Sequence, residues 1–487
     1  MRSVRGDRDG AGMGSGFPLP VRRHTLRCRP LKTAPQRAAA RRLAPLRQAR
    51  AFFCKKAGLP VLLCAWLAAG ARAQEAPRPS LARQRVEQPL PTESNVKVGP
   101  ILFRFSAGLR SEWVDNVSLA NGKTTPVESD FLFNPQLGIE AVWPATKLNV
   151  LRFHTTLGLT KYLSHSALNT NDLLVSPDSE LRWQVYVGDF RVDLHDQFSY
   201  QQDPVGQGQL SNVARFGRWV NTAGLGVLWD ANDVTLSVGY DHTIFLVTGT
   251  TAAAPSVTTS ANAQDRTTDQ VAGSAALLLT GALNVGLESV ASRTRYPEAP
   301  QDDASRVSVG PYLQLLLTHY TRIYAAAGYQ GTFFDNPTPA ATTAAARTVA
   351  ATSLPRTTAA SPDSYYANLT ITHRLNRYYQ DKLSVGHDSQ IGLFAQSLET
   401  TYVNYSSILQ LSPRFDLSTS VFYEDTVETG STGALPYQRF GLALSTGCRV
   451  TKKLSATVSY QFTEKTSDNE AQNYRQNRVG LMFTYQF

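Results

Sequence analysis

The sequence has few cysteines and no apolar run long enough for a membrane helix. Only four of its 487 residues are cysteine, and Cys28, Cys54 and Cys64 all precede residue 74. With Cys448 alone in the rest of the chain, neither a disulfide framework nor a cysteine-based metal site can form there. Every apolar run is shorter than the roughly 20 residues of a transmembrane helix. These absences exclude a disulfide-stapled secreted domain and a helical membrane protein.

Sequence motifs of catalytic and nucleotide-binding sites are also absent. The chain contains no Gly-x-Ser-x-Gly, His-Glu-x-x-His or Cys-x-x-Cys pattern. The paired glycines at 206–208 and 224–226 lack the third glycine and the following helix of a phosphate-binding loop. The histidines after residue 74 fall on separate segments, so none of them suggests a metal site or an activated nucleophile. We therefore expect no catalytic residue, no cofactor and no metal.

The first 73 residues have the features of a secretory signal peptide. An arginine-rich segment ends in two lysines at 55–56 and is followed by an apolar run of 14 residues at 57–70. Small residues at Ala71 and Ala73 then form a small-x-small cleavage site. We expect residues 1–73 to be a signal peptide with an extended basic n-region, removed by cleavage after Ala73.

Removing this segment reverses the charge balance of the chain. The whole chain has a net charge of +10, but residues 1–73 carry 16 basic and 2 acidic residues. Residues 74–487 then hold 32 basic and 36 acidic residues, a net charge of −4. The basic character belongs to the segment that we expect to be cut off, so we expect no nucleic-acid partner.

Alternating apolar and polar residues dominate the chain after residue 100. Residues 74–99 are rich in Pro, Arg, Gln and Glu without any period, which predicts a flexible periplasmic linker. After it, the period-2 alternation predicts strands, and the Gly188-Asp189 pair predicts a tight hairpin. Nine long polar connections alternate with eight short turns, which gives 18 strands. The long connections are expected at 114–130, 163–179, 201–217, 246–269, 293–305, 335–363, 388–397, 426–436 and 465–473.

The final strand favours a membrane barrel over a soluble sandwich. In 478–487 every second residue is apolar or aromatic, up to Tyr485 and Phe487. An exposed apolar edge in water invites aggregation, whereas a barrel wall turns the same face to lipid. A soluble sandwich over 100–487 would need a linker between two domains, and none is present. We predict an all-β fold, a transmembrane antiparallel up-and-down β-barrel of about 18 strands (range 16–20) over 100–487, in which the first and last strands pair.

Two of the long connections have low-complexity sequences. Thr338–Ser361 is mostly Ala and Thr, and Gly249–Asn262 is mostly Ala, Thr and Ser. Such segments bury too little apolar area to order themselves. We expect them to be external loops. The alternative is that 246–269 and 335–363 fold into the lumen as a plug.

The start of the barrel region resembles a known family. Residues 106–109 (Ser-Ala-Gly-Leu) are followed by 112–117 (Glu-Trp-Val-Asp-Asn-Val). Together with strands such as 236–240 and 454–460 and the terminal Phe487, this opening resembles a family of bacterial outer-membrane β-barrel porins of the exopolysaccharide-associated type. The resemblance implies an outer-membrane barrel without catalytic residues. It also suggests exopolysaccharide export components as partners.

The face opposite the apolar residues is expected to line an aqueous lumen. An 18-strand barrel is wide enough to leave a channel unless loops fill it. Charged residues on its inner face stay hydrated, and clustered arginines would favour anions. Each of them could instead pair with an acidic residue on a neighbouring strand. The pore-lining candidates are Arg104, Arg110, Glu112, Arg152, His154, Arg182, Arg191, Asp193, His195, Arg306, Asp416, Glu424, Arg439, Arg449 and Arg478.

Together these features predict a porin-like channel in the bacterial outer membrane. Small hydrophilic solutes would diffuse passively through its charged lumen, with a link to polysaccharide traffic. The alternative is a non-conducting structural or export-accessory barrel that acts through partners; an outer-membrane hydrolase lacks any motif. Outer-membrane lipid would surround the barrel, and the barrel-assembly machinery would read Tyr485 and Phe487 as an insertion signal. No sequence feature indicates the oligomeric state.

Overall fold

The computed structural model describes residues 95–146, 148–170, 172–252, 264–297, 303–335, 363–393, 397–429 and 436–487. The predicted signal peptide 1–73 and most of the linker 74–99 lie outside these residues. The low-complexity segment Thr338–Ser361 and most of Gly249–Asn262 lie outside them as well.

Within the described residues, 18 long strands make up nearly the whole structure. They are β2 (Ile101–Val114), β3 (Asp130–Pro144), β4 (Val150–Gly158), β7 (Glu180–Val187), β8 (Phe190–Gln201), β9 (Val213–Ala231), β10 (Val234–Ala252), β11 (Arg266–Thr280), β12 (Leu283–Arg295), β13 (Ala304–Thr318), β14 (Thr321–Phe334), β15 (Asp363–His373), β16 (Tyr379–Ile391), β17 (Ser397–Ser412), β18 (Phe415–Thr429), β19 (Tyr437–Arg449), β20 (Leu454–Ser467) and β21 (Tyr474–Gln486). The short elements are β1 (Val96–Val98), β5 (Lys161–Tyr162), β6 (Leu174–Val175) and the 3-10 turns η1 (Ser166–Leu168) and η3 (Glu470–Gln472).

These strands close into a barrel. Each long strand pairs antiparallel with the next along the chain, and β21 returns to pair with β2. The closing register runs from Ser106 opposite Gln486 to Val114 opposite Arg478. Closure leaves no long strand with a free edge, which is the arrangement that hydrocarbon surroundings require of a sheet. The predicted 18-strand up-and-down barrel, with its first and last strands paired, is confirmed.

Long and short connections alternate as predicted, and the Gly188-Asp189 hairpin joins β7 to β8. Several strand boundaries differ from the prediction, three of them as follows. The strand β1 lies inside the expected linker 74–99 and extends the β2 ladder. The expected loop 201–217 is shorter because β9 already begins at Val213, and β10 continues to Ala252. Both extensions carry apolar side chains that pack inside the barrel, as described below.

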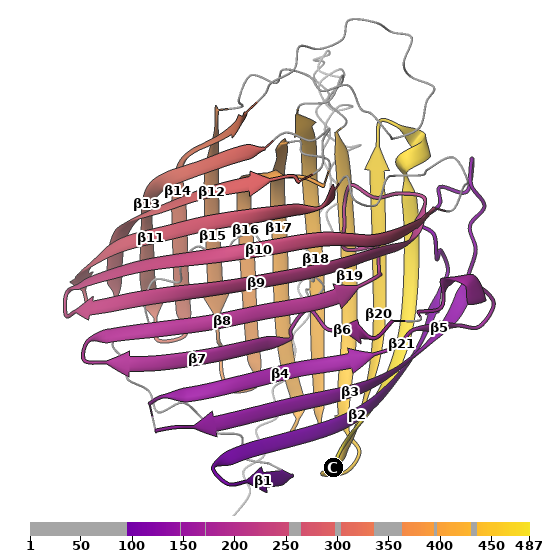
Figure 1. Ribbon diagram of the computed structural model, residues 1–487, viewed down its shortest axis with the longest axis horizontal. Helices are drawn as coiled ribbons and strands as arrows, with labels where there is room; N and C mark the ends of the chain where they lie inside the picture. The colour runs from indigo at the N-terminus through magenta and orange to yellow at the C-terminus, as the bar shows by residue number, and fades with distance from the viewer. Residues whose placement is uncertain are drawn as a thin grey trace, which may run out of the picture. The chain divides into compact units, whose positions relative to one another are not determined.

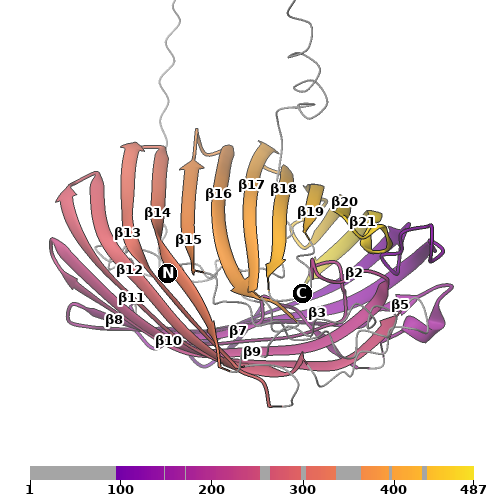
Figure 2. The same ribbon diagram turned by 90° about the horizontal axis from the view of Figure 1, so that it is seen from above.

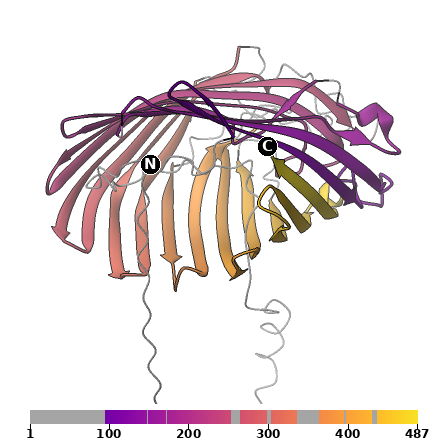
Figure 3. The ribbon, with the colours of Figure 1, turned by 90° about the horizontal axis from the view of Figure 1, so that it is seen from below.

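The strands curve into a flattened ring. Viewed from above and from below, β13–β21 form one wall and β2–β10 form the facing wall (Figures 2 and 3). The front strands cross those of the rear wall steeply, and the C-terminus lies near β1 (Figure 1).

The outer face of the barrel is apolar. Exposed side chains include Leu109, Phe131, Trp183, Val238 and Phe483. Along their strands such positions alternate with charged ones, for example Arg110 and Arg182, so they form the outer face. A band of this kind suits contact with lipid. Within the described part of the chain, no helix has the length and apolarity needed to cross a membrane.

Candidate functional site: the barrel interior and its crossing loop

The connection between β8 and β9 folds into the barrel. Residues 202–212, here called the crossing loop, begin on one wall and contact β18–β21 and the β20–β21 connection on the other. In strand order β9 and β19 stand nearly half-way round the barrel from each other. The loop must therefore cross the barrel to reach β19. Its partners Arg439 and Arg478 are inner-face residues, so this loop spans the lumen.

Arginines anchor the first half of the crossing loop. Arg478 of β21 binds the Asp203 carboxylate through two hydrogen bonds of 2.5 and 3.0 Å. Arg218 of β9 donates to the Asp203 carbonyl oxygen at 2.8 Å. Arg439 of β19 donates to the Val205 carbonyl oxygen at 3.1 Å. Burial would raise the pKa of Asp203, but the positive charge of Arg478 outweighs it and holds this pKa below its ordinary value.

Polar contacts fix the second half of the crossing loop. Gln209 donates to the Glu428 carboxylate at 3.1 Å and accepts from the Leu393 backbone N–H at 2.6 Å. Ser211 donates to the Gln472 carbonyl oxygen at 2.8 Å. Asn212 donates through its side chain to the Ala471 carbonyl oxygen at 2.8 Å. The loop is therefore held at both ends by partners far away in sequence.

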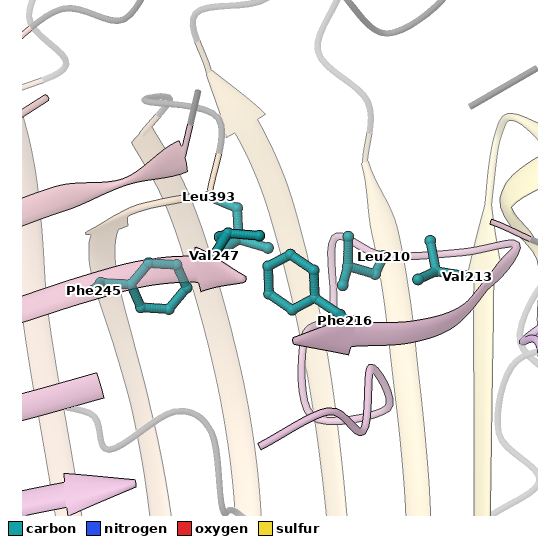
Figure 4. Packing of buried hydrophobic residues seen from close by; sticks show 6 residues of the cluster. All are labelled: Leu210, Val213, Phe216, Phe245, Val247 and Leu393. Atoms are coloured by element: carbon teal, nitrogen blue, oxygen red, sulfur yellow. The ribbon is translucent and has the colours of Figure 1, made fainter. Parts of the chain in front are cut away.

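An apolar cluster packs the crossing loop and its wall against the facing wall. Figure 4 shows its six side chains facing one another. The cluster comprises Leu210, Val213, Phe216, Phe245, Val247 and Leu393. The first three come from the crossing loop and β9, the next two from β10, and Leu393 from the β16–β17 connection on the facing wall. Phe216 is fully buried (0% exposed), so water does not reach its side chain.

A cavity of about 380 Å³ remains between the crossing loop and the β2–β4 wall. Apolar side chains, Val114, Val117, Leu168 and Ala214, pack together along one part of it. The charged residues that line it are Arg110, Glu112, Asp178, Asp203, Arg215 and Arg478. Three cations face three carboxylates, so the formal charges of the lining balance. The cavity can hold a small polar solute with an apolar portion.

Most of the predicted pore-lining residues form ion pairs. The pairs are Arg104–Glu140, Arg110–Glu112, Arg182–Asp193, His195–Asp241, Arg306–Asp388, Arg439–Glu424 and Arg478–Glu112. Arg306 reaches from β13 to Asp388 on β16 past two intervening strands, so that pair lies on the inner face. His195 meets Asp241 across Gly224, where any Cβ atom would overlap both side chains. Pairing therefore neutralises much of the charge that the sequence places on this face.

The other predicted residues lie apart from these pairs. Arg152 stands opposite Arg182 in the β4–β7 ladder, and the His154 ring lies 3.3 Å from the Asp178 carbonyl oxygen. Arg191 is half-buried on β8. Asp416 and Arg449 are exposed at the short-turn ends of β18 and β19. Among the described residues, no three His, Cys, Asp or Glu side chains are close enough to hold a metal ion.

The crossing loop is the functional element that the sequence did not reveal. Residues 201–217 were expected to form one of the long polar connections, without a direction; in the structure residues 202–212 of this connection fold inward. Pro204, Gly206 and Gly208 are typical of a loop, but they do not indicate whether the loop points outward or folds into the barrel. Leu210 is a weak local signal, because a large apolar side chain in a polar loop needs a partner. The two segments expected as the alternative plug, 246–269 and 335–363, lie largely outside the described residues.

Comparisons with known proteins give structural neighbours only. No family model matches the sequence, and no curated protein matches it. The Pseudomonas aeruginosa protein OpdK, solved with vanillate, is 11% identical; the match covers 79% of this chain and 99% of that one, with a TM-score of 0.41. Pseudomonas aeruginosa OccK3 (OpdO) is 12% identical over 79% and 96%, with a TM-score of 0.42. A BenF-like porin from Pseudomonas fluorescens Pf-5 is 8% identical over 79% and 99%, with a TM-score of 0.43. The barrel architecture itself is established by the strand pairing described above.

Proposed function

We propose that this protein is a porin-like outer-membrane channel for small hydrophilic solutes, narrowed by the crossing loop. The observation that carries the proposal is a closed 18-strand barrel with an apolar outer face and a charged inner one. Barrels of this strand number leave an aqueous interior unless loops occupy it. Here residues 202–212 occupy part of it, so diffusion is restricted to what remains beside the loop.

The placement in the outer membrane rests on the same observation. Exposed Leu109, Phe131 and Phe483 would be unfavourable in water but suit lipid. Recovery of the protein in a soluble periplasmic fraction would contradict the placement. Recovery with outer-membrane vesicles would support it.

The second candidate is a non-conducting barrel that acts through partners. The apolar cluster around Phe216 and the loop contacts favour it, because together they join opposite walls of the barrel. In that case the interior would be a rigid core rather than a passage.

Single-channel recording in planar bilayers separates the two candidates. A channel gives ohmic steps, and replacing residues 204–210 with a short glycine-serine linker should enlarge them. A matched control exchanges residues 450–453, a short turn at the other end of the barrel, and should leave the steps unchanged. If neither the native protein nor the loop-shortened variant gives current steps, although heat-modifiable migration shows that both are folded, the channel proposal is contradicted.

We infer a link to polysaccharide traffic, supported by the family resemblance of residues 112–117 and by the polar lining of the cavity. Liposome swelling with neutral oligosaccharides of increasing size tests this link. Swelling that stops at monosaccharides would contradict it.

A further inference from the structure

Lys465 of β20 is a buried amine at the docking point of the crossing loop. Its side chain belongs to a residue only 1% exposed. The ammonium donates to the Ser211 hydroxyl at 3.1 Å and lies 4.7 Å from the centre of the Tyr437 ring. Among the described ion pairs none involves Lys465, so no carboxylate lies within 4.0 Å of the amine.

Charged and titratable groups face Lys465 from every neighbouring element. Glu428 of β18 is an opposing charge that interacts with Lys465, and it accepts a hydrogen bond from Gln209. Arg439 stands opposite Lys465 in the β19–β20 ladder and brings a like charge beside it. Tyr437 lies beside it on β19, and Tyr474 of β21 stands opposite it in the ladder. The loop thus touches both members of a separated charge pair, Ser211 at the lysine and Gln209 at the glutamate.

Burying an ammonium against a hydroxyl and a ring is unfavourable, because neither replaces its hydration or its counter-charge. A neutral amine in the same place has no such penalty and still bonds Ser211. The docked loop is therefore favoured when Lys465 is uncharged. Lifting the loop admits water and favours the protonated form.

We propose that Lys465 is a proton-controlled latch for the crossing loop. At higher pH the neutral amine keeps residues 202–212 docked across the lumen. As pH falls, the amine gains a proton and the loop is released. Protonation of Glu428 acts in the same direction, because it removes both the counter-charge near Lys465 and the ionic partner of Gln209. The pH response itself follows from the contacts of the loop. Its effect on permeation rests on the proposed function: docking would narrow the channel and release would widen it.

A spin label on the loop tests the latch without relying on current. Gln207→Cys is labelled in a background in which Cys28, Cys54, Cys64 and Cys448 are replaced with serine. The protein is then refolded into lipid vesicles and measured by electron paramagnetic resonance from pH 5 to 9. The ratio of mobile to docked label should rise on acidification, by at most about tenfold per pH unit for one coupled proton. A ratio that stays constant over this range would overturn the proposal, whatever the bilayer recordings show.

Three variants make the test more specific. Lys465→Met should remove the release that comes from the lysine and keep the loop docked down to the pH at which Glu428 gains a proton, whereas Lys465→Arg, which stays charged, should keep the loop mobile at every pH. Lys382→Met removes an exposed lysine of β16 at the other end of the barrel and should leave the titration unchanged. An unchanged titration in Lys465→Met would overturn the proposal. If Lys465→Met does not fold, the arginine variant decides: a native-like titration there overturns the proposal equally.

Discussion

At the residue scale, Asp115 and Asn116 stabilise the junction between β2 and β21, where the barrel closes. The Asp115 carboxylate accepts from the backbone and side-chain N–H groups of Asn477 at 2.6 and 2.5 Å. Asn116, 1% exposed, donates to the carbonyl oxygens of Ala120 and Arg475 at 2.8 and 2.9 Å. The Asp-Asn pair in the family-like segment 112–117 thus has a structural explanation: it joins β2 to β21 and turns the chain after β2.

Replacing Asn116 with alanine should destabilise the barrel. Buried backbone groups would lose their partners, which costs about 3 kcal/mol of unfolding free energy. Urea unfolding in detergent micelles or vesicles measures the change. Asn121→Ala is the control. Asn121 bonds the Glu470 carbonyl oxygen and accepts from the backbone N–H groups of Lys123 and Thr124, but at exposed positions where water can replace it. Equal losses in the two variants would contradict the role of Asn116.

His165 should make the β4–β7 connection sensitive to pH. Its hydrogen bond to Asp130, at 2.9 Å, and a second one to Glu128 raise the pKa of His165 above its ordinary value, although burial opposes them. A raised pKa means that the stabilisation is complete below the unfolded pKa of about 6.5 and is lost as pH rises through the folded pKa.

We therefore expect residues 159–179 to exchange amide hydrogens more slowly at pH 6 than at pH 8, after correction for the intrinsic exchange rate. The His165→Asn variant should lose this difference. Equal protection at both pH values in the native protein would show that the His165 pair does not order this connection.

At the element scale, the crossing loop is positioned by an apolar core inside an otherwise polar lumen. β9 and β10, each 19 residues long, extend far enough to carry Phe216 and Phe245 inward above the charged strands. Leu393 meets them from the facing wall. This cluster compensates for the entropy of ordering a loop that contains two glycines.

Phe216→Ala should loosen the crossing loop and lower stability. A fully buried phenylalanine replaced by alanine leaves a cavity and costs about 3–5 kcal/mol. Unfolding midpoints measure the loss, and protease digestion within 202–212 reports the loop. Leu163→Ala, at a residue 69% exposed, should change neither. Unaltered digestion in Phe216→Ala would mean that the polar contacts alone hold the loop.

At the scale of the whole molecule, closure and the apolar outer face belong together. A barrel of 18 strands satisfies its backbone internally, and only then can side chains such as Phe131 and Phe483 face lipid without leaving polar groups exposed to it. The terminal Phe487 adds little to closure. Its backbone N–H donates one hydrogen bond of 3.3 Å to the Phe105 carbonyl oxygen, and its exposed ring meets the Tyr485 ring edge-on, with the ring centroids 5.5 Å apart.

Deleting Phe487 should therefore affect assembly more than stability. We expect the unfolding midpoint of the refolded protein to stay near that of the native chain. The folded fraction recovered from outer membranes should fall several-fold, because the proposed insertion signal is incomplete. Heat-modifiable migration measures both samples. A parallel fall in stability and assembly would contradict a signalling role.

The sequence alone determined the barrel, its strand number and its closure. Alternation with period 2 is local, and each hairpin turn lies beside the strands that it joins, so 18 strands and the pairing of β2 with β21 could be predicted. The charged face could be predicted for the same reason, since residues such as Arg182 and Asp193 lie on neighbouring strands. Only the tertiary structure decided the interior. The partners of the crossing loop on the facing wall lie more than 180 residues away, at Leu393, Glu428, Gln472 and Arg478. No local pattern in residues 202–212 predicts these contacts, because only closure of the barrel brings the loop and its partners close together.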